Sequence, residues 1–150
     1  MESETVLRER WHALLSCYNG VAGELERGLQ ERHGLTLSEF ETLDRLVVAA
    51  CEKRRMQDLA ADMYLSQSAL SRAVARLEKG GLVERALCHA DRRGVFVAVT
   101  EAGHRRHAEA RVTHLAVLVE HLTTAPAGSA GAGCAARTTG RGGPAGDVAR

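Results

Sequence analysis

The stretch Ser66-Gln-Ser-Ala-Leu-Ser-Arg-Ala-Val-Ala-Arg-Leu-Glu-Lys79 decides the fold. Ser66 is a residue type that favours a helix N-cap, and Gly80 with Gly81 predicts the end of that helix. One side of the helix is apolar and carries Leu70, Ala73, Val74 and Leu77. The other side carries Gln67, Ser68, Ser71, Arg72, Ala75, Arg76 and Lys79. The sequence therefore predicts a helix that buries one face and exposes small polar side chains and arginines on the other.

A short helix precedes this stretch, with its apolar side chains predicted to point inward: Met56, Leu59, Ala60 and Met63. The charged residues Glu52 to Arg55 predict a turn before it. Two helices joined by a tight turn, the second of them exposed at its N-terminus, form a motif that enters the major groove of DNA. We therefore interpret the second helix as a DNA-recognition helix.

The residue types of the recognition helix predict two kinds of DNA contact. Gln67, Ser68 and Arg72 are the candidates for base edges, because arginine pairs with guanine and glutamine with adenine. Ser71 and Arg76 are the candidates for phosphate contacts, and the capping Ser66 completes the DNA-facing set.

Downstream, two short β-prone runs, Leu82 to Leu87 and Gly94 to Val99, are joined by Cys88-His-Ala-Asp-Arg-Arg93. We interpret them as a hairpin, the wing of a winged helix-turn-helix. Its charged tip carries Asp91, Arg92 and Arg93, and guanidinium groups suit the negative potential of a narrow minor groove. Taken singly, each arginine could equally belong to a solvated surface. The order helix, turn, helix, hairpin favours binding to double-stranded DNA.

Two outer helices flank this core. The apolar positions of the first run from Val6 to Leu29, and Gly34 closes it. Ser38 with Glu41 has the spacing of a capping box for the next helix, and Thr100 can cap a last helix that continues to Leu122. The predicted fold class is mainly α with a small antiparallel β-hairpin (α+β). The winged helix-turn-helix occupies about 36–103 of a domain at 1–122.

The composition changes after Leu122. The 28 residues from Thr123 to Arg150 include seven Gly, eight Ala and two Pro. A segment of this kind buries too little apolar surface to offset its ordering entropy. We predict that 123–150 is a disordered tail.

Overall composition excludes several classes. The 150 residues carry 20 Lys and Arg against 19 Asp and Glu, whereas the segment 66–93 carries six against three, so the basic signal is local. No apolar run is long enough to span a bilayer and no signal peptide precedes the domain, so we expect a cytoplasmic protein without a membrane partner. The four cysteines form no CxxC pair. No catalytic motif is present, and we expect neither an enzyme nor a cofactor.

Several of these segments carry a resemblance to a known family. They are Gly34-Leu-Thr-Leu-Ser-Glu-Phe40, Arg55-Met-Gln-Asp-Leu-Ala60, Leu65-Ser-Gln-Ser-Ala-Leu-Ser-Arg72, Arg76-Leu-Glu-Lys-Gly-Gly-Leu-Val83, Asp91-Arg-Arg-Gly94 and Thr100-Glu-Ala-Gly103. Over about 5–122 the chain resembles the multiple-antibiotic-resistance regulator (MarR) family.

The resemblance implies a homodimer that binds a palindromic operator and represses transcription until a small phenolic or anionic molecule, or an oxidant, releases it. It places Ser66 to Arg76 on the recognition helix, and Asp91 and Arg93 on the wing, where the aspartate steadies the arginine. It also implies dimerisation through the N- and C-terminal helices. Pairing two half-sites agrees with the few base pairs that one winged helix can contact.

Candidate sensing residues lie in the outer helices. Trp11 and Tyr18 are the candidates for an effector site, although a lone tryptophan more often packs in a core or dimer interface. Cys17 resembles the reactive cysteine of a peroxide-sensing branch, but an inert buried thiol is the favoured alternative. The last helix has a histidine stripe, His104, His107, His114 and His121. His107, His114 and His121 are seven residues apart, a rise of about 10.5 Å, which is too far for one metal ion. Only His104 and His107 could share a metal, and they would need further ligands, so we predict a solvated or interface stripe and no metal.

The chain departs from the family pattern at its C-terminus. Family members close the dimer with a further helix, whereas this chain continues into its Gly/Ala-rich tail. The alternative function is therefore a degenerate or heterodimerising interaction module with weak affinity for DNA.

Overall fold

The structure is a computed structural model that describes residues 2–49, 53–88 and 91–123, without the side chains of 87–93. Its elements are α1 (Glu4–His33), α2 (Leu37–Val48), β1 (Arg54–Arg55), α3 (Met56–Asp62), α4 (Gln67–Lys79), β2 (Val83–Cys88), β3 (Asp91–Val99) and α5 (Glu101–Leu122). The predicted mainly helical class with a small antiparallel sheet is confirmed. The prediction of a disordered tail falls, beyond Thr123, outside the described residues. No helix within the described ranges is long and apolar enough to cross a membrane.

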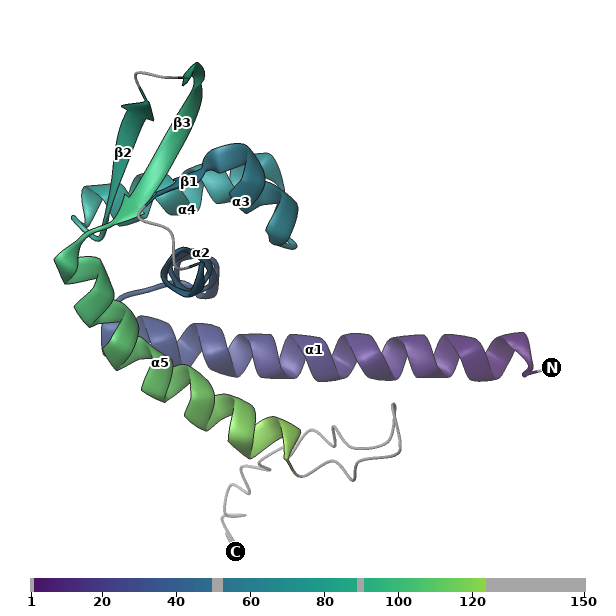
Figure 1. Ribbon diagram of the computed structural model, residues 1–150. Helices are drawn as coiled ribbons and strands as arrows, with labels where there is room; N and C mark the ends of the chain where they lie inside the picture. The colour runs from purple at the N-terminus through teal and green to yellow at the C-terminus, as the bar shows by residue number, and fades with distance from the viewer. Residues whose placement is uncertain (1, 50–52, 89–90, 124–150) are drawn as a thin grey trace, which may run out of the picture.

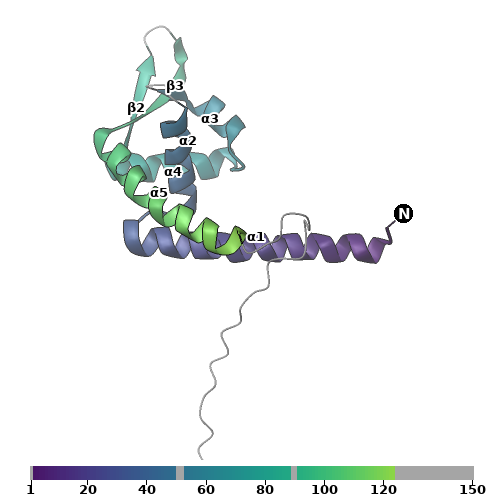
Figure 2. The same ribbon diagram turned by 60° about the horizontal axis from the view of Figure 1, so that its bottom comes forward.

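The helix α1 supports the domain with its C-terminal part only. Val21, Leu25 and Leu29 are buried there, and Gly34 ends the helix in the left-handed conformation with φ 65°. The N-terminal half extends away from the other elements (Figures 1 and 2) and leaves Leu7, Trp11 and other large apolar side chains exposed. We call this half, whose large apolar side chains are exposed, the α1 arm.

The cap of α2 differs from the one predicted. The N-cap is Thr36, whose side chain accepts from the Glu39 N–H at 3.1 Å, while the Glu39 carboxylate accepts from the Thr36 N–H at 3.0 Å. The predicted box of Ser38 with Glu41 is wrong by two residues, because Thr36 and Glu39 have the same spacing and Ser38 already lies inside the helix. The shift leaves Glu41 free to point elsewhere.

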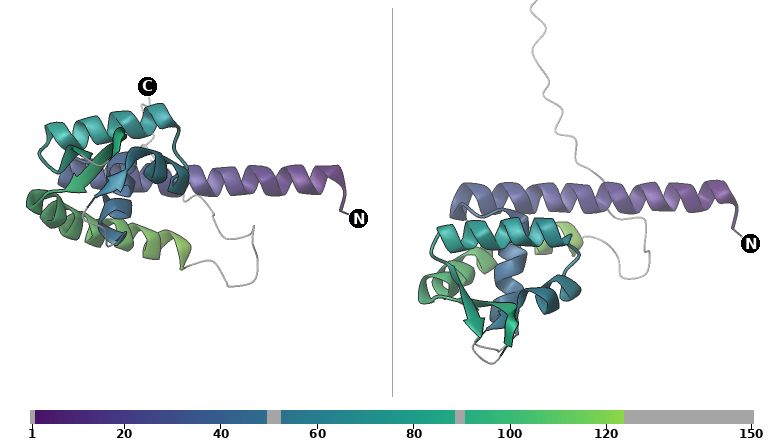
Figure 3. Two further views of the ribbon diagram at one scale, coloured as in Figure 1. Left: turned by 45° about the horizontal axis from the view of Figure 1, so that its top comes forward. Right: turned by 90° about the horizontal axis from the view of Figure 1, so that it is seen from above.

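The core of the winged helix forms where α2, α3 and α4 meet. Its fully buried side chains include Phe40, Leu43, Leu59, Leu70 and Val74. The views in Figure 3 show α2 enclosed between α1, α5 and the α3–α4 pair. The predicted apolar face of α4 is confirmed, since Leu70, Ala73, Val74 and Leu77 are all buried. Because α4 buries this face, its opposite face is turned to the outside.

The wing belongs to a sheet of three strands in the order β1-β3-β2. The predicted hairpin is confirmed, although β3 begins at Asp91 and not at Gly94. The prediction of a turn through Arg55 is wrong, because Arg54 and Arg55 pair antiparallel with Val97 and Phe96 of β3. A two-residue strand leaves no periodic pattern in the sequence, so only the tertiary contact with β3 defines it.

The start of α5 is locked against the end of the α4 segment. The Leu82 carbonyl accepts from the Thr100 N–H at 3.0 Å. The Thr100 hydroxyl donates to the Gly81 carbonyl at 2.7 Å and, as predicted, caps the helix by accepting from the Gly103 N–H at 3.0 Å. A Cβ on Gly103 would lie 2.1 Å from the Leu82 carbonyl oxygen. The Thr-x-x-Gly spacing therefore combines a cap with a backbone approach that only glycine allows.

We predict that Gly103→Ala destabilises the fold by about 1–3 kcal/mol, because the added Cβ forces the Leu82 backbone to move. The matched control is Gly23→Ala, where a Cβ meets nothing within 4 Å and the helix gains about 0.5–1 kcal/mol. Urea unfolding of both variants measures the change. Equal midpoints for Gly103→Ala and the wild type would show that the junction tolerates a side chain.

Candidate nucleic-acid interface

The N-terminus of α4 presents the predicted DNA-contacting residues as one surface. The Ser66 hydroxyl caps the helix by accepting from the Ala69 N–H at 3.2 Å, which confirms the predicted cap. The predicted residues on the helix and its cap are all exposed: Ser66, Gln67, Ser68, Ser71, Arg72 and Arg76. In Figure 1 this helix lies beside the base of the wing. The arrangement can offer amide, hydroxyl and guanidinium donors to one groove of a duplex.

Arg76 lies beside the buried carboxylate of Glu39. Its Nη1 lies 3.8 Å from Oε1 of Glu39, a side chain that is 6% exposed and already fixed by the α2 capping box. Most of the Arg76 side chain remains exposed. Glu39 therefore caps α2 and also pairs with an arginine on the exposed face of α4. The sequence could not show this pairing, because it joins two different helices.

The wing tip carries the other predicted contacts. Asp91, Arg92 and Arg93 begin β3, which pairs with β2 through Cys88 opposite Asp91. The side chains of these three residues lie outside the description, so the contact between Asp91 and Arg93 stays a prediction. The backbone places the tip at the end of the hairpin farthest from α5.

A basic group at the base of the wing was missed. Lys53 Nζ lies 5.3 Å from the centre of the Phe96 ring, and Arg55 Cζ lies 5.6 Å from it. These are cation–π distances. Arg55 belongs to β1, which pairs with β3, and Lys53 immediately precedes that strand. The charged run before α3 was the available signal, but it predicted a turn because nothing in the sequence pairs it with the wing.

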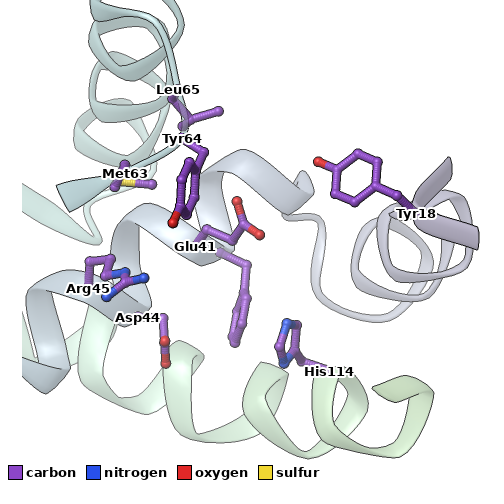
Figure 4. Close-up of a pocket in the computed structure, with 9 residues that line it drawn as sticks. Tyr18, Glu41, Asp44, Arg45, Met63, Tyr64, Leu65 and His114 are labelled. Atoms are coloured by element: carbon purple, nitrogen blue, oxygen red, sulfur yellow. The ribbon is translucent and has the colours of Figure 1, made fainter. Parts of the chain in front are cut away.

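The candidate effector residues separate in the structure. Trp11 is 59% exposed on the α1 arm and does not line the cleft to which Tyr18 belongs. Tyr18 lines a cleft of about 430 Å³, shared with Glu41, Asp44 and Arg45 of α2, Tyr64 before α4, and His114 of α5 (Figure 4). Phe40, Met63 and Leu65 complete its lining. Cys17 is half-buried on α1 and does not line the cleft.

The histidine stripe of α5 is partly internal, so the prediction of a solvated or interface stripe is wrong for two members. His107 is buried and its Nε2 lies 2.7 Å from Asp44 Oδ1. The Phe40 ring stacks on His107 at 5.7 Å and on His114 at 4.6 Å between centroids. His104 is exposed and His121 half-buried. Among the residues described, no three His, Cys, Asp or Glu side chains are placed to hold a metal ion.

Two titratable groups of the cleft have shifted pKa values. Desolvation lowers the pKa of His114 from its usual 6.5, while the charge of Asp44 acts in the opposite direction. Desolvation raises the pKa of Glu41, and Arg45 opposes that shift. The cleft therefore favours a neutral His114 and resists the ionisation of Glu41.

Comparison with known proteins gives one consistent result. A family model described as MarR family matches residues 33–94. AbsC, a MarR family transcriptional regulator from Streptomyces coelicolor, is 32% identical over 84% of this chain and 85% of its own, with a TM-score of 0.73. No curated protein sequence matches the chain.

Two further solved structures are similar and hold ligands. Sco3205, a MarR family transcriptional regulator from Streptomyces coelicolor solved in complex with DNA, is 27% identical, with a TM-score of 0.76 over 82% of this chain and 77% of its own. CouR from Rhodococcus jostii RHA1, bound to p-coumaroyl-CoA, is 32% identical, with a TM-score of 0.65 over 75% and 78%.

We predict that His114 makes the fold sensitive to acid. Because its pKa is lowered in the folded protein, His114 binds a proton more readily in the unfolded chain. The contribution of His114 to the free energy of unfolding is therefore highest above about pH 6.5 and decreases as the pH falls below that value. His114→Phe should keep the contact with Phe40 and lose this part of the pH dependence. Urea unfolding at about pH 5 and about pH 8 measures the difference.

The matched variant His114→Leu also lacks an ionisable group, and should lose the same pH dependence while being less stable at both pH values because the ring stacking is gone. Acid sensitivity in both variants equal to that of the wild type would contradict the assignment to His114.

Proposed function

The chain belongs to the MarR family, and we propose that it is a sequence-specific regulator that binds a palindromic operator as a homodimer and represses transcription. The observation that carries the proposal is the exposed N-terminal surface of α4. Gln67, Ser68 and Arg72 project there from a capped helix whose opposite face is buried. The similarity to Sco3205, which was solved with DNA, supports it.

The proposed division of labour follows from the chemistry of each group. Gln67, Ser68 and Arg72 contact base edges in the major groove, whereas Ser66, Ser71 and Arg76 contact the backbone. Arg92 and Arg93 enter the adjacent minor groove, with Asp91 holding Arg93 in position. Lys53 and Arg55 add positive charge at the base of the wing, where it attracts phosphates.

The homodimer is proposed from the apolar surface that the outer helices leave exposed. On α5 the exposed residues follow a helical stripe: Val112, Leu115, Val119 and Leu122. The α1 arm exposes a second stripe: Leu7, Trp11 and Leu14. Stripes of this length on long helices are typical of subunit interfaces. A second copy would cover both and would place two recognition helices side by side on DNA.

We further propose that a small molecule in the cleft beside Tyr18 releases the DNA. The cleft touches Tyr64 and Leu65, which immediately precede the cap of α4, so an occupant contacts the segment that positions the recognition helix. Trp11 lies in the proposed dimer interface and not in this cleft. A regulator of this kind performs no catalysis, and its DNA target places it in the cytoplasm.

The experiment is binding of the full chain to the DNA upstream of its own gene at two salt concentrations, with light scattering to give the mass of the complex. A dimer that contacts about 6–10 phosphates should lose about 10³–10⁵ in affinity between about 50 and 200 mM salt. A monomer without salt-dependent binding would contradict the proposal and favour the interaction module.

We predict that Arg72→Ala costs about 1–3 kcal/mol of binding free energy and relaxes the preference for the operator over unrelated DNA. Arg76→Ala should weaken binding to all sequences alike, because a phosphate contact carries no sequence information. The charge-matched control is Arg105→Ala, a residue of α5 that pairs with Glu101 on the exposed surface. Equal losses for all three variants on all sequences would refute the assigned roles.

A further inference from the structure

The cleft beside Tyr18 contains more carboxylate than guanidinium. Glu41 and Asp44 contribute two carboxylates, and Arg45 contributes one cation. His114 adds no charge near neutral pH, because desolvation lowers its pKa below 6.5. Asp44 already accepts a hydrogen bond from the buried His107 at 2.7 Å. An anion entering the cleft would therefore meet two acids for one arginine.

Glu41 is the acid without a partner. Within the described residues its carboxylate takes part in no hydrogen bond or salt bridge, although Arg45 lies close enough to oppose its pKa shift. In Figure 4 the Glu41 carboxylate lies between the rings of Tyr18 and Tyr64, while Arg45 lies on the other side of Tyr64. Desolvation without a compensating contact raises the pKa of Glu41. The Glu41 side chain is nevertheless exposed at the cleft, so its carboxylate is within reach of a bound cation.

The walls of the cleft suit an aromatic ligand. The rings of Tyr18 and Tyr64 are exposed, at 68% and 104% of their reference areas, so both are available to a ligand. Phe40 and His114 form a stacked pair at 4.6 Å on the opposite wall. Aromatic rings attract both flat apolar groups and organic cations. The volume of about 430 Å³ is sufficient for one or two fused rings.

We propose that this cleft binds an aromatic organic cation, a protonated amine or amidine attached to one or two rings, with Glu41 as its counter-ion and Tyr18 and Tyr64 as its walls. The proposal rests on the proposed function, because it names the chemical class of the molecule that releases the DNA. It differs from the phenolic or anionic class that the family resemblance implies. The difference follows from the charges that this chain places in its own cleft.

The test uses three probes that share one ring system: 1-naphthylmethylamine, 1-naphthalenemethanol and 1-naphthoate. Calorimetric titration of the full chain near neutral pH should show the amine binding at least about tenfold tighter than the alcohol, and the naphthoate binding weakest. The affinity for the amine should fall as the pH is lowered through the raised pKa of Glu41, because the protonated acid no longer pairs with a cation.

Two variants that each remove one charge distinguish a cation site from an anion site. Glu41→Gln should reduce the amine affinity to that of the alcohol, whereas Arg45→Gln should increase it because a like charge is removed. Naphthoate binding tightest and being lost in Arg45→Gln would overturn the proposal in favour of an anion site. Failure of all three probes to bind would overturn it as well.

Measuring operator binding on the same protein sample distinguishes failure of the cation site from failure of the proposed function. Thermal unfolding of Glu41→Gln first establishes that the variant folds. Operator binding is then measured on the wild type without any probe. If the wild type binds the operator in a salt-dependent way but binds none of the probes, only the proposed cation site is refuted. If the wild type does not bind the operator, the proposed regulatory function is refuted.

Discussion

One backbone contact fixes the geometry on which the other parts depend. The Leu82 carbonyl, which follows the recognition helix by three residues, accepts from Thr100 and approaches Gly103 too closely for any side chain. The end of α4, the root of the wing and the first turn of α5 therefore meet at one point. Because this contact is made by backbone atoms, it leaves little freedom in the angle between α4 and the long outer helix α5. In the proposed dimer, that angle would set the spacing of the two recognition helices.

A second set of contacts joins the outer helices to the winged helix from below. His33 Nε2 lies 2.8 Å from Thr113 Oγ1, and Arg106 donates to the His33 carbonyl at 2.6 Å, so α1 and α5 are held together. Asp44 with His107, and Phe40 with His114, attach α5 to α2. The cleft opens beside these contacts and reaches the residues before the cap of α4. An occupant would act on the same elements that determine where the recognition helix lies.

The sequence predicted the features that local patterns specify. The cap at Ser66, the buried face of α4, the hairpin and the cap at Thr100 each follow from residue type and spacing over a few positions. It could not predict contacts between distant segments: the β1 strand, the Glu39 link to Arg76, and the burial of His107 against Asp44. The position of the α2 cap was missed because two Ser/Thr-x-x-Glu spacings overlap there. Of the two candidate effector residues, only Tyr18 lines the cleft. The sequence could not separate them, because a helical stripe does not show which part of the helix packs against the rest of the chain.

The central claim is that two copies of this winged helix bind one operator through α4 and the wing. Hydroxyl-radical footprinting of the bound operator tests it most directly, because it maps backbone protection at single-nucleotide resolution. We expect two equivalent protected patches whose centres lie about one helical turn apart, or a multiple of it, with minor-groove protection flanking each. A single protected half-site would contradict the dimer, and uniform protection without patches would contradict sequence-specific binding.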